Sequence, residues 1–530
     1  MQTERFFDRE EYLGILQKRV LGLKEGYRQN LAIIGDELAG KTSLIFQFLN
    51  KFWDNRIIVV YLEVRPDSLS AFAKKFIGIL LYNFLANNNI ALKEDLDYLI
   101  ERSRAYIPKT AEKIKYILLA LGKRKKQSIL RELFLLCDSI HQETSKSCVV
   151  ILDEFLNLEK LGIKDPYKEW SKLIMLQKNT LYIVISSLKF KSRQILSKDL
   201  SLLFGNFQLL ELEPFDMKTT EEYLDYKLSE LELTPGLKNF LVHFTGGYPF
   251  YLEIITDALL RSKGHSLADI LVELFFETQG VLHQRFSTYL KRFQDNPNSR
   301  DHLAILYLVA AGHNRIKDIA HRLAKQKSIL ISRVSRLLEL DVLSRSGDFL
   351  NINDRVFGFW LKFVHQEKAR ALIFDAQNKR DLLHQQIEMM IADFMQDAQK
   401  PFKERVSELM QLFQDETIQL ERKKLRLSHF REIKTLEFNS RNIREGLIGR
   451  SNDSLWIVAF KPDSVTEDDV VDFVKECKRY RHKLQRKIII TLREVDQNAH
   501  LRAMEEKVFT WDLNKLNQIF DLFCQSRVVV

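Results

Sequence analysis

Several short stretches in the first 215 residues are apolar at nearly every position, and segments with helical spacing separate them. They are Asn30–Ile34, Arg56–Val64, Ser147–Phe155, Thr180–Ser187 and Phe207–Phe215. Strands that are apolar on both faces are typical of a parallel sheet covered by helices on both sides. The pattern therefore predicts an α/β core over residues 1–215, with one helix at Thr42–Phe52 and further helices through much of residues 71–144.

After Phe215 the apolar strands stop, and helical spacing continues through residues 216–295. The stretch Asp295–Asp301 is predicted to be a linker because Asn, Pro, Asp and Ser favour turns. The charged segment 366–430 is predicted to be a helical linker. In residues 431–530 strand and helix patterns alternate again, which predicts a second, smaller α/β domain.

Residues 296–365 have the order of a winged helix-turn-helix: a helix at Ile316–Ala324, a second at Ser328–Leu340, and a hairpin that turns at Ser346-Gly347-Asp348. We expect the second helix to turn four apolar residues inward, with Ser328, Ser332 and two arginines outward. The four are Ile329, Ile331, Val334 and Leu338. In such units the second helix enters the major groove, so Arg333 and Arg336 are candidate DNA-binding residues. The alternative is that the unit packs against the core as a regulatory element.

The segment GDELAGKT, Gly35–Thr42, matches G-x-x-x-x-G-K-[ST] and lies between an apolar strand and a helix. In this pattern main-chain N–H groups and the helix N-terminus hold phosphate oxygens. Lys41 would neutralise the β- and γ-phosphates, and the Thr42 hydroxyl would ligate Mg²⁺. The nucleotide-binding candidates are Gly35, Asp36, Glu37, Leu38, Ala39, Gly40, Lys41, Thr42 and Ser43. The alternative is a chance match in an ordinary strand–turn–helix.

Two carboxylates end a later apolar strand, CVVILDEF, at what would be the carboxyl edge of the sheet. Ligands bind at this edge in open α/β folds. Asp153 is the candidate Mg²⁺ ligand, and Glu154 is the candidate base that orients or deprotonates the attacking water. Ser186 or Ser187, at the tip of the next strand, would hydrogen-bond the γ-phosphate or the water, with Ser187 preferred. Lys41, Glu154 and Ser187 are thus the catalytic candidates.

Together with these motifs, further segments give the chain a resemblance to the archaeal-type ATPases of the STAND class, which are relatives of AAA+ proteins. The segments are FFDREEYLGIL (Phe6–Leu16), LEPFDMKTTEEYL (Leu212–Leu224), FTGGYPFYLEII (Phe244–Ile255) and FLNINDRVFGFWLKFV (Phe349–Val364). The resemblance implies an ATPase core, a helical lid at 216–295 and a winged helix at 296–365. It also implies that Arg9 lies beside the adenine and that Pro249 forms part of a lid wall against the adenosine.

One departure from this family concerns the charge that faces the γ-phosphate. The family commonly has Gly-Arg before the fifth strand, whereas this chain has Asn206 in the arginine position. Arg193 is the nearest basic substitute upstream. The resemblance therefore implies slow hydrolysis, with ATP acting as a switch more than as a fuel.

The C-terminal segment 431–530 resembles a restriction-endonuclease-like domain. An active member has a separate Asp followed by Glu-x-Lys, and this chain has Ala459-Phe460-Lys461, with Asp453 as the only acid available. We therefore expect the fold without the cleavage. The basic run Lys475–Lys487 adds Lys478, Arg479 and Arg481 as candidate DNA-binding residues, and the alternative is a solvated helical face.

Composition changes this interpretation little. The chain has 530 residues, a formal charge of +10, 19 Gly and 9 Pro, which favours several helix-rich domains and an anionic partner. The four cysteines lie outside metal-ligand spacing and are expected to be buried thiols, which favours the cytoplasm. No membrane association is expected.

The resulting hypothesis is a slow switch ATPase that uses ATP or ADP with Mg²⁺ and engages DNA or a protein partner, with homo-oligomerisation as a further possibility. The alternatives are an ATP-dependent nuclease or defence effector, and an AAA+ DNA-loading protein.

Overall fold

The computed structural model describes residues 6–88, 90, 92–121, 126–200, 207–231, 233–262, 264–294, 298–370, 375–420, 423–440, 442–452, 454–480 and 484–529. The chain divides into two compact units. Unit 1 runs to Phe215 and also includes Tyr248–Phe250 and Glu339–Asp341, while unit 2 contains the remainder. Asn206, Asp453 and Arg481, all singled out from the sequence, lie outside the described residues.

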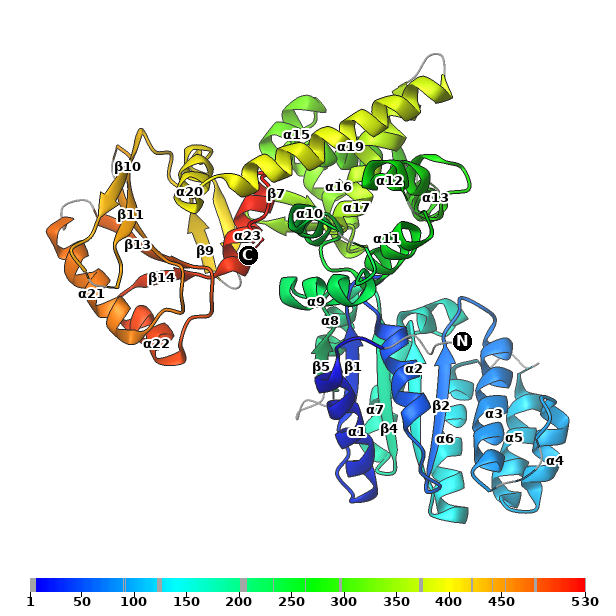
Figure 1. The fold of residues 1–530 in the computed structure, drawn as a ribbon. Coiled ribbons are helices and arrows are strands. Elements are labelled where there is room, and N and C mark those ends of the chain that lie inside the picture. The colour runs from blue at the N-terminus through cyan, green and yellow to red at the C-terminus, as the bar shows by residue number, and fades with distance from the viewer. Residues whose placement is uncertain are drawn as a thin grey trace. The chain divides into compact units, whose positions relative to one another are not determined.

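Unit 1 is built on a five-stranded sheet in the order β2-β3-β4-β1-β5, and each pair of neighbours is parallel (Figure 1). The strands are β1 (Asn30–Ile34), β2 (Ile57–Glu63), β3 (Ser147–Asp153), β4 (Thr180–Ser186) and β5 (Phe207–Glu211). The residues of β1, β3 and β4 are buried throughout, which agrees with the continuous apolar pattern. The parallel α/β core predicted from the sequence is confirmed.

Helices cover both faces of this sheet. The helices of unit 1 are α1 (Glu10–Lys24), α2 (Lys41–Lys51), α3 (Leu69–Ala86), α4 (Leu96–Arg104), α5 (Pro108–Ala120), α6 (Lys126–Thr144), α7 (Pro166–Leu176) and α8 (Lys189–Lys198). On one face Leu16 of α1 and Leu44 of α2 pack with Ile33. On the other face Phe76 and Trp170 pack with Val150. Because β1 leads directly into α2, the phosphate-loop motif lies at the carboxyl edge of the sheet.

By length and composition α3 is apolar enough to cross a membrane, with a mean hydropathy of 1.3 over its 18 residues. Half of these residues are buried inside unit 1, and α3 packs against β2 and α4. A helix in the core of a domain has the same composition as a spanning helix, so the packing of α3 accounts for its hydropathy.

Unit 2 begins with a helical region followed by a two-stranded sheet. Its elements in this part are α9 (Met217–Lys227), α10 (Pro235–Thr245), α11 (Pro249–Arg261), α12 (Leu267–Phe276), α13 (Val281–Gln294), α14 (Ser299–Ala310), α15 (Ile316–Arg322), α16 (Lys327–Glu339), β6 (Leu343–Ser346), β7 (Phe349–Ile352) and α17 (Arg355–Trp360). The predicted hairpin is confirmed, and its turn is at Gly347-Asp348. The predicted linker differs in part, because Ser299–Asp301 form the first turn of α14 and Asp301 supplies its acidic side chain.

The segment 366–430 also differs from the predicted helical linker. It contains α18 (Gln366–Arg370), α19 (Ala376–Gln399) and α20 (Phe402–Gln411), and then the hairpin of β8 (Thr417–Leu420) and β9 (Lys423–Arg426). α19 packs on α10 and α12, and the apolar residues of α20 belong to the C-terminal core. The buried positions of α19 are widely spaced: they are Leu383, Ile387 and Phe394.

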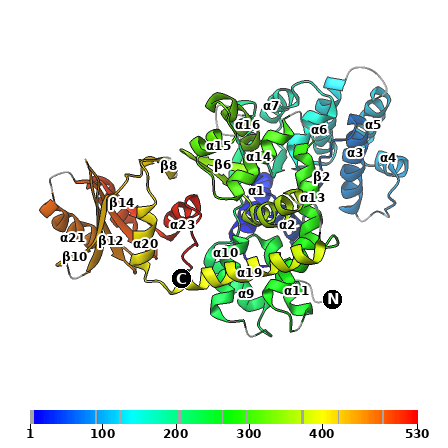
Figure 2. The same cartoon turned by 90° about the horizontal axis from the view of Figure 1, so that it is seen from above.

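The C-terminal part of unit 2 holds a five-stranded mixed sheet in the order β10-β11-β12-β13-β14. Its elements are β10 (Glu432–Glu437), β11 (Glu445–Arg450), β12 (Leu455–Lys461), α21 (Glu467–Cys477), β13 (Leu484–Thr491), α22 (Gln497–Glu505), β14 (Val508–Trp511) and α23 (Leu513–Leu522). β10, β11 and β12 are antiparallel, whereas β12, β13 and β14 are parallel. Figure 2 shows α21 on one side of the sheet and α20 with α23 on the other.

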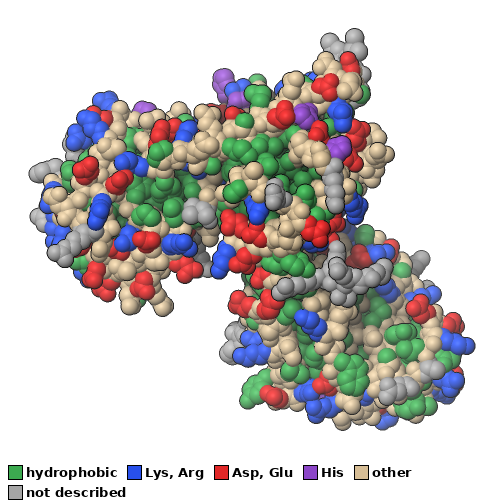
Figure 3. Space-filling view, in the orientation of Figure 1, with side chains coloured by type: hydrophobic (Ala, Val, Ile, Leu, Met, Phe, Trp, Pro, Cys, Tyr) green, Lys and Arg blue, Asp and Glu red, His purple; other side chains and the backbone are tan. Residues whose placement is uncertain are grey.

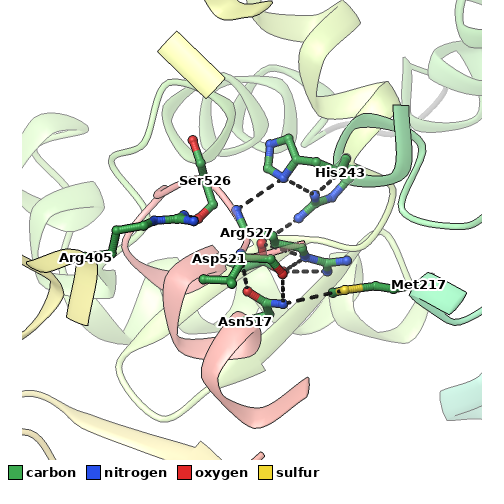
Figure 4. Close-up of polar contacts among 9 residues, drawn as sticks. Met217, His243, Arg405, Asn517, Asp521, Ser526 and Arg527 are labelled. Carbon is green, nitrogen blue, oxygen red and sulfur yellow. Dashed lines mark hydrogen bonds and ion pairs between the residues drawn. The ribbon is translucent and has the colours of Figure 1, made fainter. Parts of the chain in front are cut away.

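A half-buried charge cluster attaches the C-terminal segment to the rest of unit 2 (Figure 4). Asp521 of α23 pairs with Arg355 and with Arg527, each at 2.6 Å. Burial alone would raise the pKa of Asp521, but the two guanidinium groups outweigh it and lower this pKa to about 2. The main-chain N–H of Arg527 donates to Nδ1 of His243 at 3.3 Å. The cluster therefore joins the last helix to α10 and α17.

We expect the attachment of this segment to weaken in mild acid. Burial, together with Arg355, holds the pKa of His243 well below its usual value, and its Nδ1 accepts a hydrogen bond only when the ring is neutral. His243 binds a proton more readily when the segment is detached than when it is attached, so the attachment is strongest above about pH 6.5 and weakens as the pH falls below it. Hydrogen exchange of residues 513–528, corrected for its intrinsic rate, should accelerate between about pH 7.5 and 5.5.

The variant His243→Asn keeps an acceptor close to the Nδ1 position but does not titrate. This pH dependence should therefore disappear in the variant, even if the loss of ring stacking on Phe394 makes it less stable overall. An equal acceleration of exchange in both proteins would contradict the assignment.

Candidate functional site

The loop between β1 and α2 has the conformation that its glycines predict. Gly40 has φ +89° and precedes α2, and Leu38 has φ +76°. A Cβ atom on Gly35 would lie 2.3 Å from the carbonyl oxygen of Leu212, so only glycine fits there. No side chain caps α2 at Gly40. The first main-chain N–H groups of α2 are therefore left to point at a ligand.

Lys41 is a buried cation at the centre of this loop, with only 5% of its surface exposed. Its Nζ donates to the carbonyl oxygens of Gly35 (3.0 Å) and Asp36 (2.7 Å). Burial lowers the pKa of Lys41, while the nearby carboxylates of Glu154 and Asp153 act in the opposite direction. Because its hydrogen bonds go to neutral carbonyl groups, the ammonium group remains suited to an anionic ligand.

Asp153 connects the loop to two strands. Its Oδ2 accepts hydrogen bonds from the hydroxyls of Thr42 and Tyr61, both at 3.0 Å, and its Oδ1 accepts from the main-chain N–H of Glu154 at 2.9 Å. Burial and the negative charge of Asp153 raise the pKa of Tyr61. Tyr61 was not predicted from the sequence. Tyr61 lies on β2, which pairs with β3 in the sheet. Its place near Asp153 could have been predicted only if the order of the strands had been known.

Thr42 and Asp153 fit a magnesium site that a nucleotide completes. Mg²⁺ prefers oxygen ligands and commonly takes one or two from the protein, with the rest from phosphates and water. Within the described part of the chain, no group of three or more His, Cys, Asp or Glu side chains is arranged to hold a metal. At a nucleotide site, Thr42 and Asp153 would supply one hydroxyl and one carboxylate, and phosphates and water would supply the other ligands.

Glu154 leaves the strand in a left-handed conformation with φ 51°, which ends β3 two residues before the predicted end at Phe155. The hydroxyl of Ser187 donates to Glu154 Oε1 at 2.5 Å. Burial raises the pKa of Glu154, and the Ser187 hydrogen bond and Lys41 oppose this effect. Ser186 has a different role, because its Oγ accepts from the main-chain N–H of Leu188. Ser187 is therefore the residue of the pair that faces Glu154.

A second cation beside the loop was missed by the sequence analysis. Lys189 forms an ion pair with Asp36 at 2.8 Å, and the Tyr248 hydroxyl donates to the same Asp36 oxygen at 3.2 Å. Arg193, the substitute suggested by the sequence, instead pairs with Glu211 at an exposed position. Lys189 follows Ser187 by two residues. Its position just after a strand end could therefore have identified it as a candidate from the sequence.

Arg9 and Pro249, the nucleotide-binding candidates outside the loop, each lie at the start of a helix. Arg9 is buried, donates to the carbonyl of Glu213 and places its guanidinium 4.9 Å from the centre of the Phe215 ring. It thus ties the start of α1 to the segment after β5. Pro249 is the first residue of α11, directly after Tyr248.

The buried and exposed faces of α16 agree only in part with the prediction from the sequence. Leu330, Val334 and Leu337 face the core, whereas Ile329 and Ile331, predicted to face inward, are exposed. These two isoleucines flank Leu330, and successive helical residues are separated by about 100°, so they cannot share its face. Arg333 lies between the core and solvent and pairs with Asp301 at 3.3 Å, while Arg336 is exposed.

Ala459, which stands in place of the Glu of the Glu-x-Lys pattern, lies on β12 of the C-terminal sheet. Gly446 pairs with Ala459, and a Cβ on Gly446 would meet the carbonyl oxygen of Val458 and the ring of Phe438. Lys461 lies 3.6 Å from Asp469 of α21. Lys478 and Arg479 follow α21 and are exposed, and Arg479 pairs with Glu476 at 3.0 Å.

Three solved structures illustrate what this chain is similar to. A Walker-type ATPase of Pyrococcus abyssi is 19% identical over 68% of this chain and 97% of that chain, with a TM-score of 0.49. The Aeropyrum pernix ORC1 protein in complex with DNA is 12% identical over 67% of this chain and 92% of its own, with a TM-score of 0.35. AMPPCP-bound DnaA from Aquifex aeolicus is 16% identical over 63% and 90%, with a TM-score of 0.29.

A scan of protein-family models and a search of curated proteins found no match to this chain. The parallel sheet and the loop of unit 1 themselves fit the α/β fold of P-loop NTPases. Because each of the three TM-scores is below 0.5, function is inferred from this chain's own residues.

We expect Gly35→Ala to destabilise unit 1 as well as its phosphate site. The added methyl group would force apart β1 and the segment after β5, and such overpacking typically costs about 1–3 kcal/mol. Gly14→Ala is the matched control, because a Cβ there meets nothing within 4 Å and lies within α1, where alanine favours the helix. Urea unfolding of both variants should move the midpoint down for Gly35→Ala and not for Gly14→Ala.

Proposed function

We propose that unit 1 binds ATP with Mg²⁺ and hydrolyses it slowly. The observation that carries this proposal is the buried ammonium of Lys41, which among the described residues donates hydrogen bonds to two main-chain carbonyls at the start of a helix that no side chain caps. Phosphate oxygens are the acceptors that main-chain N–H groups at a helix N-terminus and a neighbouring ammonium group bind. Burial of a lysine is costly, and an ordinary strand–turn–helix does not require it.

Each residue of the site then has a distinct role. Lys41 binds the β- and γ-phosphates, and Thr42 with Asp153 would hold Mg²⁺, whose positive charge neutralises the phosphates. Glu154 orients the attacking water and accepts its proton. Ser187 holds the Glu154 carboxylate in place through their hydrogen bond.

Slow hydrolysis is proposed because Lys189, the second cation beside the loop, already forms an ion pair within the protein. Lys189 is paired with Asp36, so it must exchange that partner for the γ-phosphate before it can stabilise the transition state. We expect a turnover rate below about 10 s⁻¹, the median for enzymes.

We further propose that unit 2 binds a partner and that the nucleotide state of unit 1 controls this binding. Residues 296–365 are proposed to be a winged helix, and residues 431–530 to be an inactive restriction-endonuclease-like domain. Ala459, in place of the Glu of the Glu-x-Lys pattern, argues against the alternative of an active nuclease. DNA or a protein is the proposed partner, and the exposed Arg336, Lys478 and Arg479 are the candidate contacts for DNA.

Lys41→Ala should abolish ATP binding, because it removes the charge that the phosphates require. Isothermal titration of the full chain with Mg·ATP should show at least a hundredfold loss of affinity, equivalent to about 2.7 kcal/mol. Lys51→Ala, at the exposed end of the same helix, removes the same charge and should bind normally. If wild-type protein bound neither ATP nor ADP, the proposal would be wrong.

Glu154→Gln should keep ATP binding and lose hydrolysis. Glu169→Gln, which changes a half-buried carboxylate on α7 paired with Lys172, should hydrolyse ATP normally. Since burial raises the pKa of Glu154, the base loses its charge at a higher pH than an ordinary Glu. On acidification the rate should therefore begin to fall at a pH above the usual Glu pKa of about 4.3. Ser187→Ala should move this fall to still higher pH. Unchanged turnover in Glu154→Gln would remove Glu154 from the role.

A further inference from the structure

A cavity of about 430 Å³ lies beside β14, the last strand of the C-terminal sheet. Its volume is within the range of about 300–1,000 Å³ that is usual for small-molecule sites. The hairpin β8–β9, the start of β13 and the end of α22 form the other walls. The apolar part of the lining includes Leu420, Leu425, Ala503, Met504, Phe509 and Trp511.

Basic side chains surround this apolar lining. They are Lys423, Arg486, His500, Lys507 and Lys515, and among the described residues that line the cavity there is no carboxylate. Such an arrangement favours a ligand with more than one negative charge, because a single carboxylate would engage only one of these groups. Figure 3 shows hydrophobic side chains exposed among Lys and Arg side chains on the face of the C-terminal domain that it displays.

Arg486 is the most informative of these residues. Its Nε is buried and has no hydrogen-bond partner within the described part of the chain. The guanidinium group lies 4.8 Å from the centre of the Phe509 ring, so packing holds it in place. Buried donors are nearly always paired in folded proteins. An acceptor from outside the chain would satisfy this one.

We propose that this cavity binds a nucleotide unit, that is, a phosphate joined to an aromatic base, either free or at the end of a nucleic-acid strand. A phosphate monoester carries between one and two negative charges near neutral pH, which matches the cluster of basic side chains. The base would pack on the apolar wall beside the Arg486–Phe509 pair, as bases stack on aromatic and guanidinium planes elsewhere. All of these residues belong to unit 2, so the proposal goes beyond the ATP site and does not depend on it.

The test uses the full chain carrying Lys41→Ala, so that the phosphate loop of unit 1 does not contribute binding. The probes for isothermal titration are AMP, a 5′-phosphorylated oligothymidylate and the same strand with a 5′-hydroxyl end. We expect about one equivalent of AMP or of the phosphorylated strand to bind, and the hydroxyl strand to bind at least tenfold more weakly. Binding of AMP alone would identify a free nucleotide as the ligand, and binding of the phosphorylated strand would identify a strand end.

Adding Arg486→Gln should weaken binding of the preferred probe at least tenfold. Lys434→Gln is the matched control, because it removes one exposed charge from β10 at the opposite edge of the sheet. Met504→Glu, at an exposed position of the lining, should also weaken binding without disturbing the core. The proposal is overturned if none of the probes binds at about 1 mM, if Lys434→Gln causes an equal loss, or if an acidic peptide without a base binds more tightly.

Discussion

The turn from β1 into α2 is the constraint on which the rest of unit 1 depends. It buries the ammonium of Lys41 where β1, β3 and β4 reach the same edge of the sheet. A buried cation is costly unless opposite charge is near, and Asp153 and Glu154 lie close enough to oppose the effect of burial on its pKa. The parallel sheet therefore does more than support the loop. It brings to one place the groups that make the burial of Lys41 tolerable.

Two adjacent carboxylates acquire different functions in this arrangement because the backbone changes direction between them. Asp153 is the last residue of β3 and accepts hydrogen bonds from Thr42, Tyr61 and the main chain. Glu154 has a left-handed backbone conformation and meets Ser187 from the neighbouring strand tip. The Asp153 carboxylate is held in place by three hydrogen-bond donors and is suited to hold an ion. The other is more easily protonated and suited to proton transfer.

In the C-terminal sheet of unit 2, the close packing of β11 on β12 depends on a glycine. A Cβ atom on Gly446 would meet the ring of Phe438 and the carbonyl oxygen of Val458. The basic and apolar side chains that are available to a ligand lie beside β14. The charge cluster around Asp521 also binds the end of the chain to α10 and α17, so the C-terminal segment is an integral part of unit 2.

The sequence by itself determined the strands of the α/β core, the phosphate loop and the two carboxylates, Asp153 and Glu154, at the end of the third strand, because apolar runs and glycine spacing are local signals. It did not determine which of Ser186 and Ser187 faces Glu154, or that Tyr61 and Lys189 belong to the site. Those contacts join segments far apart in the chain, and only the order of the strands brings them together. The buried face of α16 and the packing of 366–430 were missed for a related reason: which side of a helix is buried depends on the neighbours it meets, and sparse apolar positions acquire a partner only in the tertiary structure.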